Sequence, residues 1–294
     1  MKIKQLESRW AIFFMFPAVI GLLVFSIIPI MASFYYSTLD WFGFRDMEFI
    51  GLDNFKTLLV DEKFYQAMFN TFRMAIFTVP IGILLSCVIA ALLNKKIRGV
   101  GVYRVLFYLP VVTMPAAISL VFKNLFNQEF GWINGFLEMA GFQGVNWLSD
   151  PAIAWITVSI IVIWMGLGFK IVILLASMQN IPQSYYDAAD IDGVGPIRRF
   201  FSITVPMVSP VLFFLLITGI IGAMQLFDVV FMLMGMTQKG LDSTRTIIHY
   251  FYEMSFVNGD KGFGSAIVVV LFFILTFVSF INFKLQKKWV NYER

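Results

Sequence analysis

The sequence predicts an all-α integral membrane protein with six transmembrane helices, and three observations lead to this prediction. First, 59% of the 294 residues are AVILMFWYC and only 14% are charged, whereas soluble domains have about 45–50% apolar and about 25% charged residues. Second, the apolar residues gather in six stretches long enough to cross a bilayer. Third, Lys and Arg concentrate on one side of these stretches. A water-soluble fold could not cover so much apolar surface, so lipid is the expected solvent.

Each predicted span contains the roughly 20 apolar residues that a helix needs to cross the hydrocarbon core. Lys2, Lys4 and Arg9 precede the first span, as in a signal peptide. Its apolar stretch exceeds a signal-peptide core, however, so we expect it to remain as a helix. Prolines at 17, 29, 80, 110 and 115 predict kinks within the spans. One transmembrane domain over residues 1–294 would contain the spans 11–36, 69–93, 105–126, 152–178, 207–234 and 264–283.

The placement of Lys and Arg predicts that both termini lie in the cytoplasm. In that orientation the cytoplasmic segments hold 13 of the 22 Lys and Arg residues, and the outer loops hold 6. Such an excess is typical of cytoplasmic loops. The cytoplasmic residues are Lys2, Lys4, Arg9, Lys95, Lys96, Arg98, Arg104, Arg198, Arg199, Lys284, Lys287, Lys288 and Arg294; the outer ones are Arg45, Lys56, Lys63, Lys239, Arg245 and Lys261; Arg73, Lys123 and Lys170 fall within helices.

Several functions are disfavoured by composition. The single cysteine, Cys87, excludes an intrachain disulfide and a cysteine-cluster metal site. The single histidine, His249, cannot supply the ligand set of a zinc site. The net charge of +4 comes from residues at the ends of apolar segments, which indicates membrane topology rather than nucleic-acid binding.

The connection 180–206 is longer and more structured than a simple loop requires. Pro182 ends the preceding helix, and Ser184 and Asp187 stand at capping-box spacing for a new helix over 184–192. Gly193 is expected to end that helix in the left-handed conformation. Pro196 suits the first turn of a second helix. That helix would place Ile197, Phe200, Phe201 and Ile203 near one face and leave Arg198 and Arg199 exposed. Together the two short helices would form a helical knob over residues 180–206. The residues alone leave open whether this knob has a binding partner.

A pattern in this loop resembles a known family. Asp187-Ala188-Ala189, Gly193, Ile203 and Val205-Pro206 follow the spacing of the EAA loop of bacterial ABC-importer permeases, Glu-Ala-Ala-x3-Gly-x9-Ile-x-Leu-Pro. Asp187 replaces the Glu of the family pattern and keeps its negative charge on a shorter side chain, and Val205 replaces Leu. Ile191-Asp192-Gly193 and Phe200 are similar to the carbohydrate-uptake branch. The resemblance extends along the chain through residues 50–55, 103–110, 126–131, 147–151, 164–168 and 227–228. In the sugar permeases of this family a further sequence motif normally follows the one at 227–228. The matching residues in this chain, 234–238, differ from that motif.

The resemblance implies a type I (MetI-like) importer fold in a bacterial or archaeal cytoplasmic membrane. The EAA helix would insert into a cleft on a separate ATPase, with Ala188 and Ala189 allowing close approach and Asp187 facing a basic partner. Pro206 would lead into helix five. The implied partners are a second permease subunit, a dimer of ATP-binding subunits carrying ATP and Mg, an extracytoplasmic solute-binding protein and the lipid bilayer. The chain itself contains no phosphate-binding loop, so we expect no cofactor, no metal and no enzyme activity.

Solute is expected near the middle of the membrane, where ionisable residues mark candidate sites. Lys170 and Asp228 are the two that stand out, and Gln225 would share a helix face with Asp228. Gln225, Asp228 and Phe169 match sugar-contacting positions in the resembled family, with Gly166 nearby. The alternative is that Gln225 and Asp228 hydrogen-bond between helices. Lys170 is expected to extend towards the cytoplasm.

Other functions remain as alternatives to sugar import. An importer of the same type could carry glycerol phosphate, a polyol or a sialic acid. A stand-alone secondary transporter would need internal repeats and coupling carboxylates within the membrane, and the sequence contains no clear repeat. A membrane enzyme would need a cluster of catalytic groups, which one His and one distant Cys do not provide.

Overall fold

The computed structural model describes residues 13–43, 45–95, 98–236 and 239–291. The described chain forms two compact units: residues 13–62 with Tyr250–Phe273, and Lys63–His249 with residues 274–291. The expectation of one transmembrane domain stays a prediction. Several of the residues that predict the topology and the altered family motif lie outside the described parts: Lys2, Lys4, Arg9, Lys96, Arg294 and the pair 237–238.

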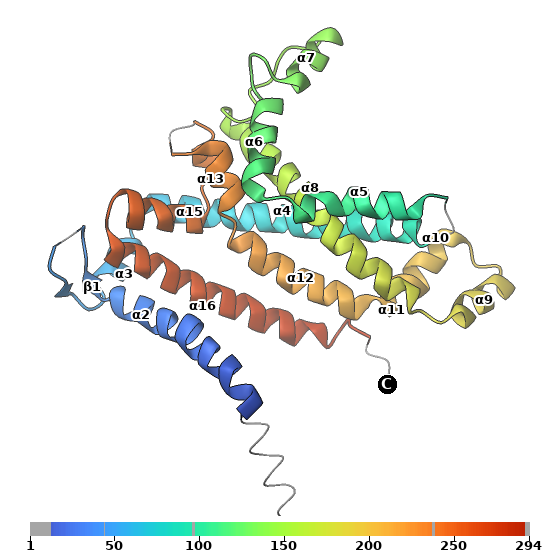
Figure 1. Ribbon diagram of the computed structural model, residues 1–294, viewed down its shortest axis with the longest axis horizontal. Coiled ribbons are helices and arrows are strands. Elements are labelled where there is room, and N and C mark those ends of the chain that lie inside the picture. The colour runs from blue at the N-terminus through green and yellow to red at the C-terminus, as the bar shows by residue number, and fades with distance from the viewer. Residues whose placement is uncertain (1–12, 44, 96–97, 237–238, 292–294) are drawn as a thin grey trace, which may run out of the picture. The chain divides into compact units, whose positions relative to one another are not determined.

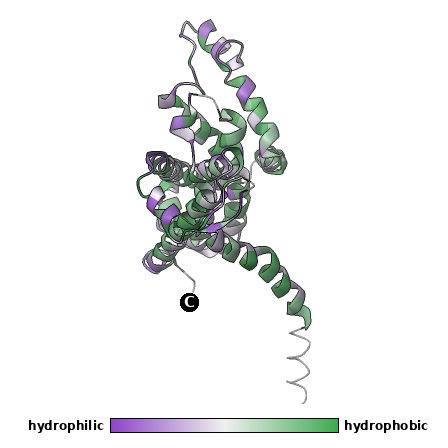
Figure 2. Cartoon of the chain, turned by 90° about the vertical axis from the view of Figure 1, so that its left-hand side faces the viewer, coloured by the Kyte–Doolittle hydropathy of each residue, from purple (hydrophilic) through white to green (hydrophobic). Residues whose placement is uncertain are grey.

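Within the described residues, four helices are individually long and apolar enough to cross a membrane (Figure 1). They are the helix Phe13–Tyr36, α4 (Glu62–Leu93), α8 (Pro151–Gln179) and α16 (Lys261–Gln286). Two further pairs of helices pass the same test only together. They give six candidate spans if each bent pair counts as one, in agreement with the predicted fold class. Figure 2 shows apolar residues along most of the helical ribbon.

The predicted span 105–126 is two helices, α5 (Val100–Val112) and α6 (Pro115–Leu125), which meet at 100°. Thr113 and Met114 are extended between them, with ψ of 139° and 131°. Proline at position 115 disfavours helical backbone in the residue before it and cannot donate a helical hydrogen bond. The expected kink is therefore a complete break.

The predicted span 207–234 also differs from expectation. The segment Pro196–Met207 meets α12 (Ser209–Met224) at 70°. Helix α12 ends at Met224, and α13 (Asp228–Met234) starts separately. Phe227, with φ −132° and ψ −60°, lies outside helical geometry. Gln225 therefore follows the last residue of α12, whereas Asp228 is the first residue of α13, and the prediction that they share one helix face is wrong.

The first unit is held together around a short β-hairpin. Strands β1 (Leu39–Asp40) and β2 (Glu48–Phe49) pair antiparallel. Asn54 in α3 (Asp53–Leu58) donates hydrogen bonds to the carbonyls of Ser37 and Leu39, at 3.0 and 2.9 Å. The Lys261 ammonium lies 4.4 Å from the centre of the Trp41 ring. In the helix Phe13–Tyr36, a π-helical turn η1 (Leu23–Ile27) precedes α2 (Ile28–Tyr36).

The core of the second unit joins α4, α8 and α13. Its buried side chains include Met74, Val158, Ile161 and Leu233. Asp150 caps α8 by accepting a hydrogen bond from the Ala152 amide at 2.9 Å, and Pro151 occupies the first turn. Helix α5 packs along α8. The remaining elements are α7 (Trp132–Met139), α9 (Gln183–Ile191), α10 (Pro196–Arg199), η2 (Phe200–Thr204), α11 (Val205–Met207), α14 (Leu241–Thr244), α15 (Ile247–Tyr252) and η3 (Glu253–Val257).

Candidate functional site

Loop 180–206 folds as two short helical segments, as predicted. Helix α9 begins at Gln183 after Pro182, and no side chain caps its N-terminus. The proposed capping box is wrong, because the helix starts one residue early and places Ser184 inside it. Asp187 instead accepts a hydrogen bond from the Gln183 side-chain amide at 3.1 Å.

Gly193 ends α9 in the left-handed conformation, with φ +68°. Its amide donates to the carbonyl of Asp190 at 3.1 Å, and the amide of Val194 donates to the carbonyl of Ala189 at 2.9 Å. These two bonds form a Schellman motif, which satisfies the last carbonyls of a helix and favours glycine at this position. The predicted role of Gly193 as a helix terminator is confirmed.

The two segments of the loop are tied together by polar side chains. The Arg199 guanidinium pairs with the Asp190 carboxylate and donates to the Val194 carbonyl at 3.2 Å. The hydroxyls of Tyr186 and Thr204 lie 3.0 Å apart. The expectation that Arg199 is exposed is wrong, since it links α10 to α9. These contacts hold the two helical segments of loop 180–206 together as one knob.

The knob carries exposed apolar side chains. Ile191 is 87% exposed, Ile197 76% and Phe201 64%. Asp187 and Ala188 are exposed, whereas Ala189 is buried within the knob. A close approach by a partner can therefore involve Ala188 but not Ala189. Ile203 and Pro206 are partly buried in η2 and α11, at the bend that leads into α12.

A second site surrounds Lys170, in the last third of α8. The Lys170 ammonium donates to the Gly166 carbonyl at 3.2 Å, one turn back along α8. It therefore points back along α8, away from loop 180–206, whereas the sequence analysis expected it to extend towards the side of the membrane on which it placed that loop. It lines a cavity of about 190 Å³ between α4, α8 and α12. A lysine in a membrane helix costs roughly 2.5–3.5 kcal/mol on insertion scales, which makes the site a functional candidate.

Of the other predicted cavity residues, Gly166 is half-buried, whereas the remaining three are exposed in this chain. Gly166 lines the Lys170 cavity. Phe169 is 44% exposed, and Gln225 and Asp228 are also exposed. Among the described residues, neither Gln225 nor Asp228 has a side-chain hydrogen bond or ion pair. The alternative role as a bond between helices of this chain therefore has no counterpart in the described part of the structure.

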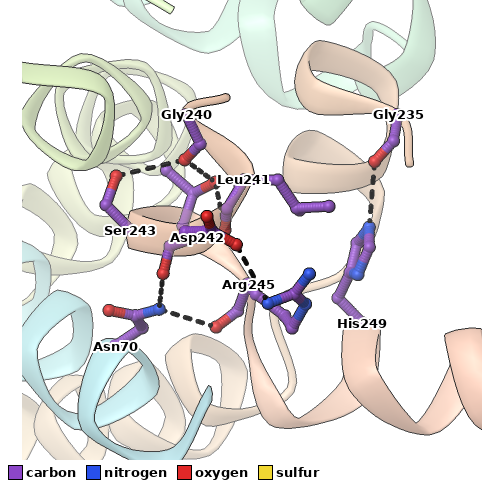
Figure 3. Close-up of polar contacts among 9 residues, drawn as sticks. Asn70, Gly235, Gly240, Leu241, Asp242, Ser243, Arg245 and His249 are labelled. Carbon is purple, nitrogen blue, oxygen red and sulfur yellow. Dashed lines mark hydrogen bonds and ion pairs between the residues drawn. The ribbon is translucent and has the colours of Figure 1, made fainter. Parts of the chain in front are cut away.

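A polar clamp that the sequence analysis missed holds segment 240–249 against α4 (Figure 3). Asn70 donates to the carbonyls of Asp242 and Arg245, at 2.9 and 3.2 Å. Arg73 donates to the carbonyl of Ser243 at 2.6 Å. The two side chains lie one turn apart on α4. A polar pair at this spacing within an otherwise apolar helix is the sequence feature from which the contact could have been predicted.

The clamp also reaches the break between α12 and α13. The Thr246 hydroxyl donates to the Leu226 carbonyl at 2.6 Å. His249, fully buried, lies with its Nε2 atom 3.3 Å from the Gly235 carbonyl, at the end of α13 (Figure 3). These contacts satisfy backbone groups that the broken helix would leave unpaired.

Comparison with known proteins agrees with this architecture. The family model described as binding-protein-dependent transport system inner membrane component matches residues 79–291. The probable ABC transporter permease protein YesP of Bacillus subtilis is 34% identical, covering 95% of this chain and 91% of YesP. The sn-glycerol-3-phosphate transport system permease protein UgpA of Escherichia coli is 33% identical, covering 98% and 97% of the two chains.

The fold also matches a solved structure. A chain from the crystal structure of a bacterial alginate ABC transporter, in complex with an alginate pentasaccharide-bound periplasmic protein, superposes with a TM-score of 0.87. The match covers 97% of this chain and 96% of that chain, at 19% identity. Fold and sequence similarity together define the class as a membrane-spanning permease component of a transport system. The chain belongs to the family of binding-protein-dependent transport system inner membrane components.

Proposed function

We propose that this chain forms half of the translocation pathway of an ABC importer for a carbohydrate. The observation that carries the proposal is similarity over nearly the whole chain to permeases named for such solutes. The lactose permease protein LacF of Rhizobium radiobacter is 34% identical, covering 92% of this chain and 91% of LacF. A second permease subunit, expected to be a paralogue, would complete the pathway, and a solute-binding protein would deliver the carbohydrate.

The energy source in this proposal is a dimer of separate ATP-binding subunits, which would hold ATP and Mg. They would dock on the exposed surface of loop 180–206, where Asp187, Ala188 and Ile191 are accessible. The knob supports this role because a rigid element can transmit a partner's movement to α12 as a rigid-body change. Docking at this loop would place it, and both termini, on the cytoplasmic side of the membrane.

The solute in this proposal contacts exposed polar and aromatic side chains near the middle of the membrane. Phe169 offers an apolar face for sugar C–H groups, and Gln225 and Asp228 offer hydrogen-bond partners for hydroxyls. Gly166 leaves space beside them.

Reconstitution tests the proposal directly. The chain would be purified with its second permease, ATPase and binding protein and inserted into proteoliposomes. The probes are neutral and acidic radiolabelled saccharides, and we expect at least one of them to accumulate in a manner that requires ATP and the binding protein. Accumulation without ATP, or ATP hydrolysis by the chain alone, would contradict the assignment.

A second solute class is favoured by the UgpA relatives, which are named for sn-glycerol 3-phosphate. The same proteoliposomes would be assayed with radiolabelled glycerol 3-phosphate. Uptake of this compound but of no saccharide, neutral or acidic, would replace carbohydrate with glycerol phosphate as the solute.

A further inference from the structure

Lys170 carries a positive charge into a part of the second unit that has no matching negative charge. Its ammonium lines the cavity between α4, α8 and α12. Within the described residues, no carboxylate lies within ion-pair distance of it. The Gly166 carbonyl accepts a hydrogen bond from the ammonium, which has three donors. The group is therefore neither neutralised nor fully hydrogen-bonded by the described protein.

Small residues create the space around this ammonium. A Cβ atom at Gly166 would lie 2.6 Å from Lys170 Nζ, and one at Gly82 would lie 3.6 Å from it. Gly219 and Gly222 line the same cavity from α12. Larger residues at Gly82 or Gly166 would fill the volume next to the charge. The helices thus leave room for a small charged group and water beside Lys170.

The cavity can be reached from the exposed face of α12. Thr218 and Gly222 line it and are exposed in the chain. Gln225 follows at helical spacing on the same face and is also exposed. Thr218 and Gln225 are seven residues apart, or roughly 10 Å along the helix. Lys170 and the proposed sugar-contacting residue Gln225 are therefore reachable from one surface.

The position along α8 places the charge inside the span. Lys170 lies nine residues before the last residue of α8, Gln179, or roughly 14 Å along the helix. This distance from the end of the helix is comparable to half the hydrocarbon thickness of about 30 Å, so Lys170 lies well within the apolar part of α8. An unpaired ammonium at that depth has a strong preference for an anionic ligand.

We infer that Lys170 binds the negative group of the solute, so that the importer selects an anionic saccharide. The shared chemistry is a carboxylate or phosphate on a sugar. In this arrangement the ammonium binds the anionic group while Gln225 and Asp228 hydrogen-bond hydroxyls elsewhere on the same molecule. The inference rests on the proposed function, because it assigns a charge class to the solute of that pathway.

The test measures binding and uptake by the assembled importer in lipid nanodiscs and proteoliposomes. Two matched pairs of radiolabelled probes separate the sources of charge: trigalacturonate with its carboxyl-reduced galactotriose, and glucose 6-phosphate with glucose. We expect the wild-type complex to prefer one anionic member over its neutral partner by at least tenfold. Lys170→Met should abolish that preference, and Lys170→Arg should retain most of it.

Two further variants make the result specific to the cavity. Gly166→Ala keeps the lysine charge but places a methyl group against the ammonium, so it should weaken binding of the anionic probe several-fold. Lys284→Gln, at an exposed position near the end of α16, removes one positive charge elsewhere and should change nothing. ATPase activity stimulated by loaded binding protein would be recorded in parallel.

The outcomes distinguish failure of the Lys170 inference from failure of the proposed function. If the wild type shows no preference for either anionic probe, or Lys170→Met keeps the preference, the Lys170 inference is overturned while ATP-driven uptake stands. If loaded binding protein stimulates no ATPase activity and no probe accumulates, the proposed function itself fails.

Discussion

Replacing Gly193 with valine tests whether the shape of loop 180–206 matters for its proposed docking. Gly193 has φ +68°, a conformation that costs an L-residue about 1–2 kcal/mol and is worse for β-branched side chains. No atom lies within 4 Å of a Cβ built at this position, apart from chain neighbours. The penalty therefore comes from the backbone alone. It threatens the two hydrogen bonds that end α9.

The expected magnitude follows from this backbone cost. A penalty of about 1–2 kcal/mol lowers the population of the native loop by about 5–30-fold relative to alternatives. If docking needs the native loop, the apparent affinity for the ATPase falls by up to the same factor. The assay is titration of the purified permease pair in nanodiscs with labelled ATPase, followed by uptake in proteoliposomes.

A matched variant separates backbone strain from the presence of a side chain. Asparagine tolerates the left-handed conformation better than other residues, so Gly193→Asn should retain affinity within a few-fold. Equal behaviour of the valine and asparagine variants would refute the role of the left-handed helix end. Unchanged ATPase affinity and uptake in Gly193→Val would refute the docking role of the loop.

Three further predictions concern stability. Gly168→Val should destabilise the packing of α5 on α8 by about 1–3 kcal/mol, because its Cβ would collide with the Phe107 carbonyl; thermal unfolding in detergent measures the loss. Asn70→Leu should lower the thermal midpoint by removing both hydrogen bonds to segment 240–249, with a cost of about 1–3 kcal/mol. Burial raises the pKa of the Asp260 carboxyl, opposed by the Phe263 amide and reinforced by Asp40. The folded state therefore loses stability as pH rises from the unfolded pKa through this raised pKa, and Asp260→Asn should remove that loss in thermal scans across pH.

Controls sharpen each of these predictions. Gly101→Ala, in open space on α5, should leave the thermal midpoint unchanged, and equal loss in both glycine variants would contradict the packing argument. Asn124, whose amide bonds only within its own helix among the described residues, gives Asn124→Leu as the comparison for Asn70. For Asp260, identical pH profiles of wild type and Asp260→Asn would contradict the effect of burial.

Much of the fold followed from local chemistry. The spans Phe13–Tyr36, α8 and α16 have the apolar length that a bilayer requires, and this length is a property of the sequence alone. The end of α9 was equally predictable, because glycine is the residue that most readily adopts φ +68° there. Pro182 and Pro196 marked the adjacent boundaries through their fixed geometry.

The departures arose where distant residues decide the local structure. The mainly apolar stretch 207–234 looked like one helix, yet it is broken at Gln225–Phe227, where the Leu226 carbonyl accepts a hydrogen bond from Thr246, twenty residues away. Arg199 was expected to be solvated, but its guanidinium forms an ion pair with the Asp190 carboxylate in the preceding helix. Ala189 looked like part of a docking surface, but it packs inside the knob. Sequence spacing does not report such contacts.

The sequence by itself determined that this chain is a multi-span membrane protein with a helical knob between its fourth and fifth spans. Apolar length and the backbone limits of proline and glycine act over a few residues, so they can be read along the chain. Only the tertiary structure decided where the helices break and where Lys170 points. Those features depend on which carbonyl, carboxylate or glycine of another helix lies beside each side chain, and packing alone brings such groups together.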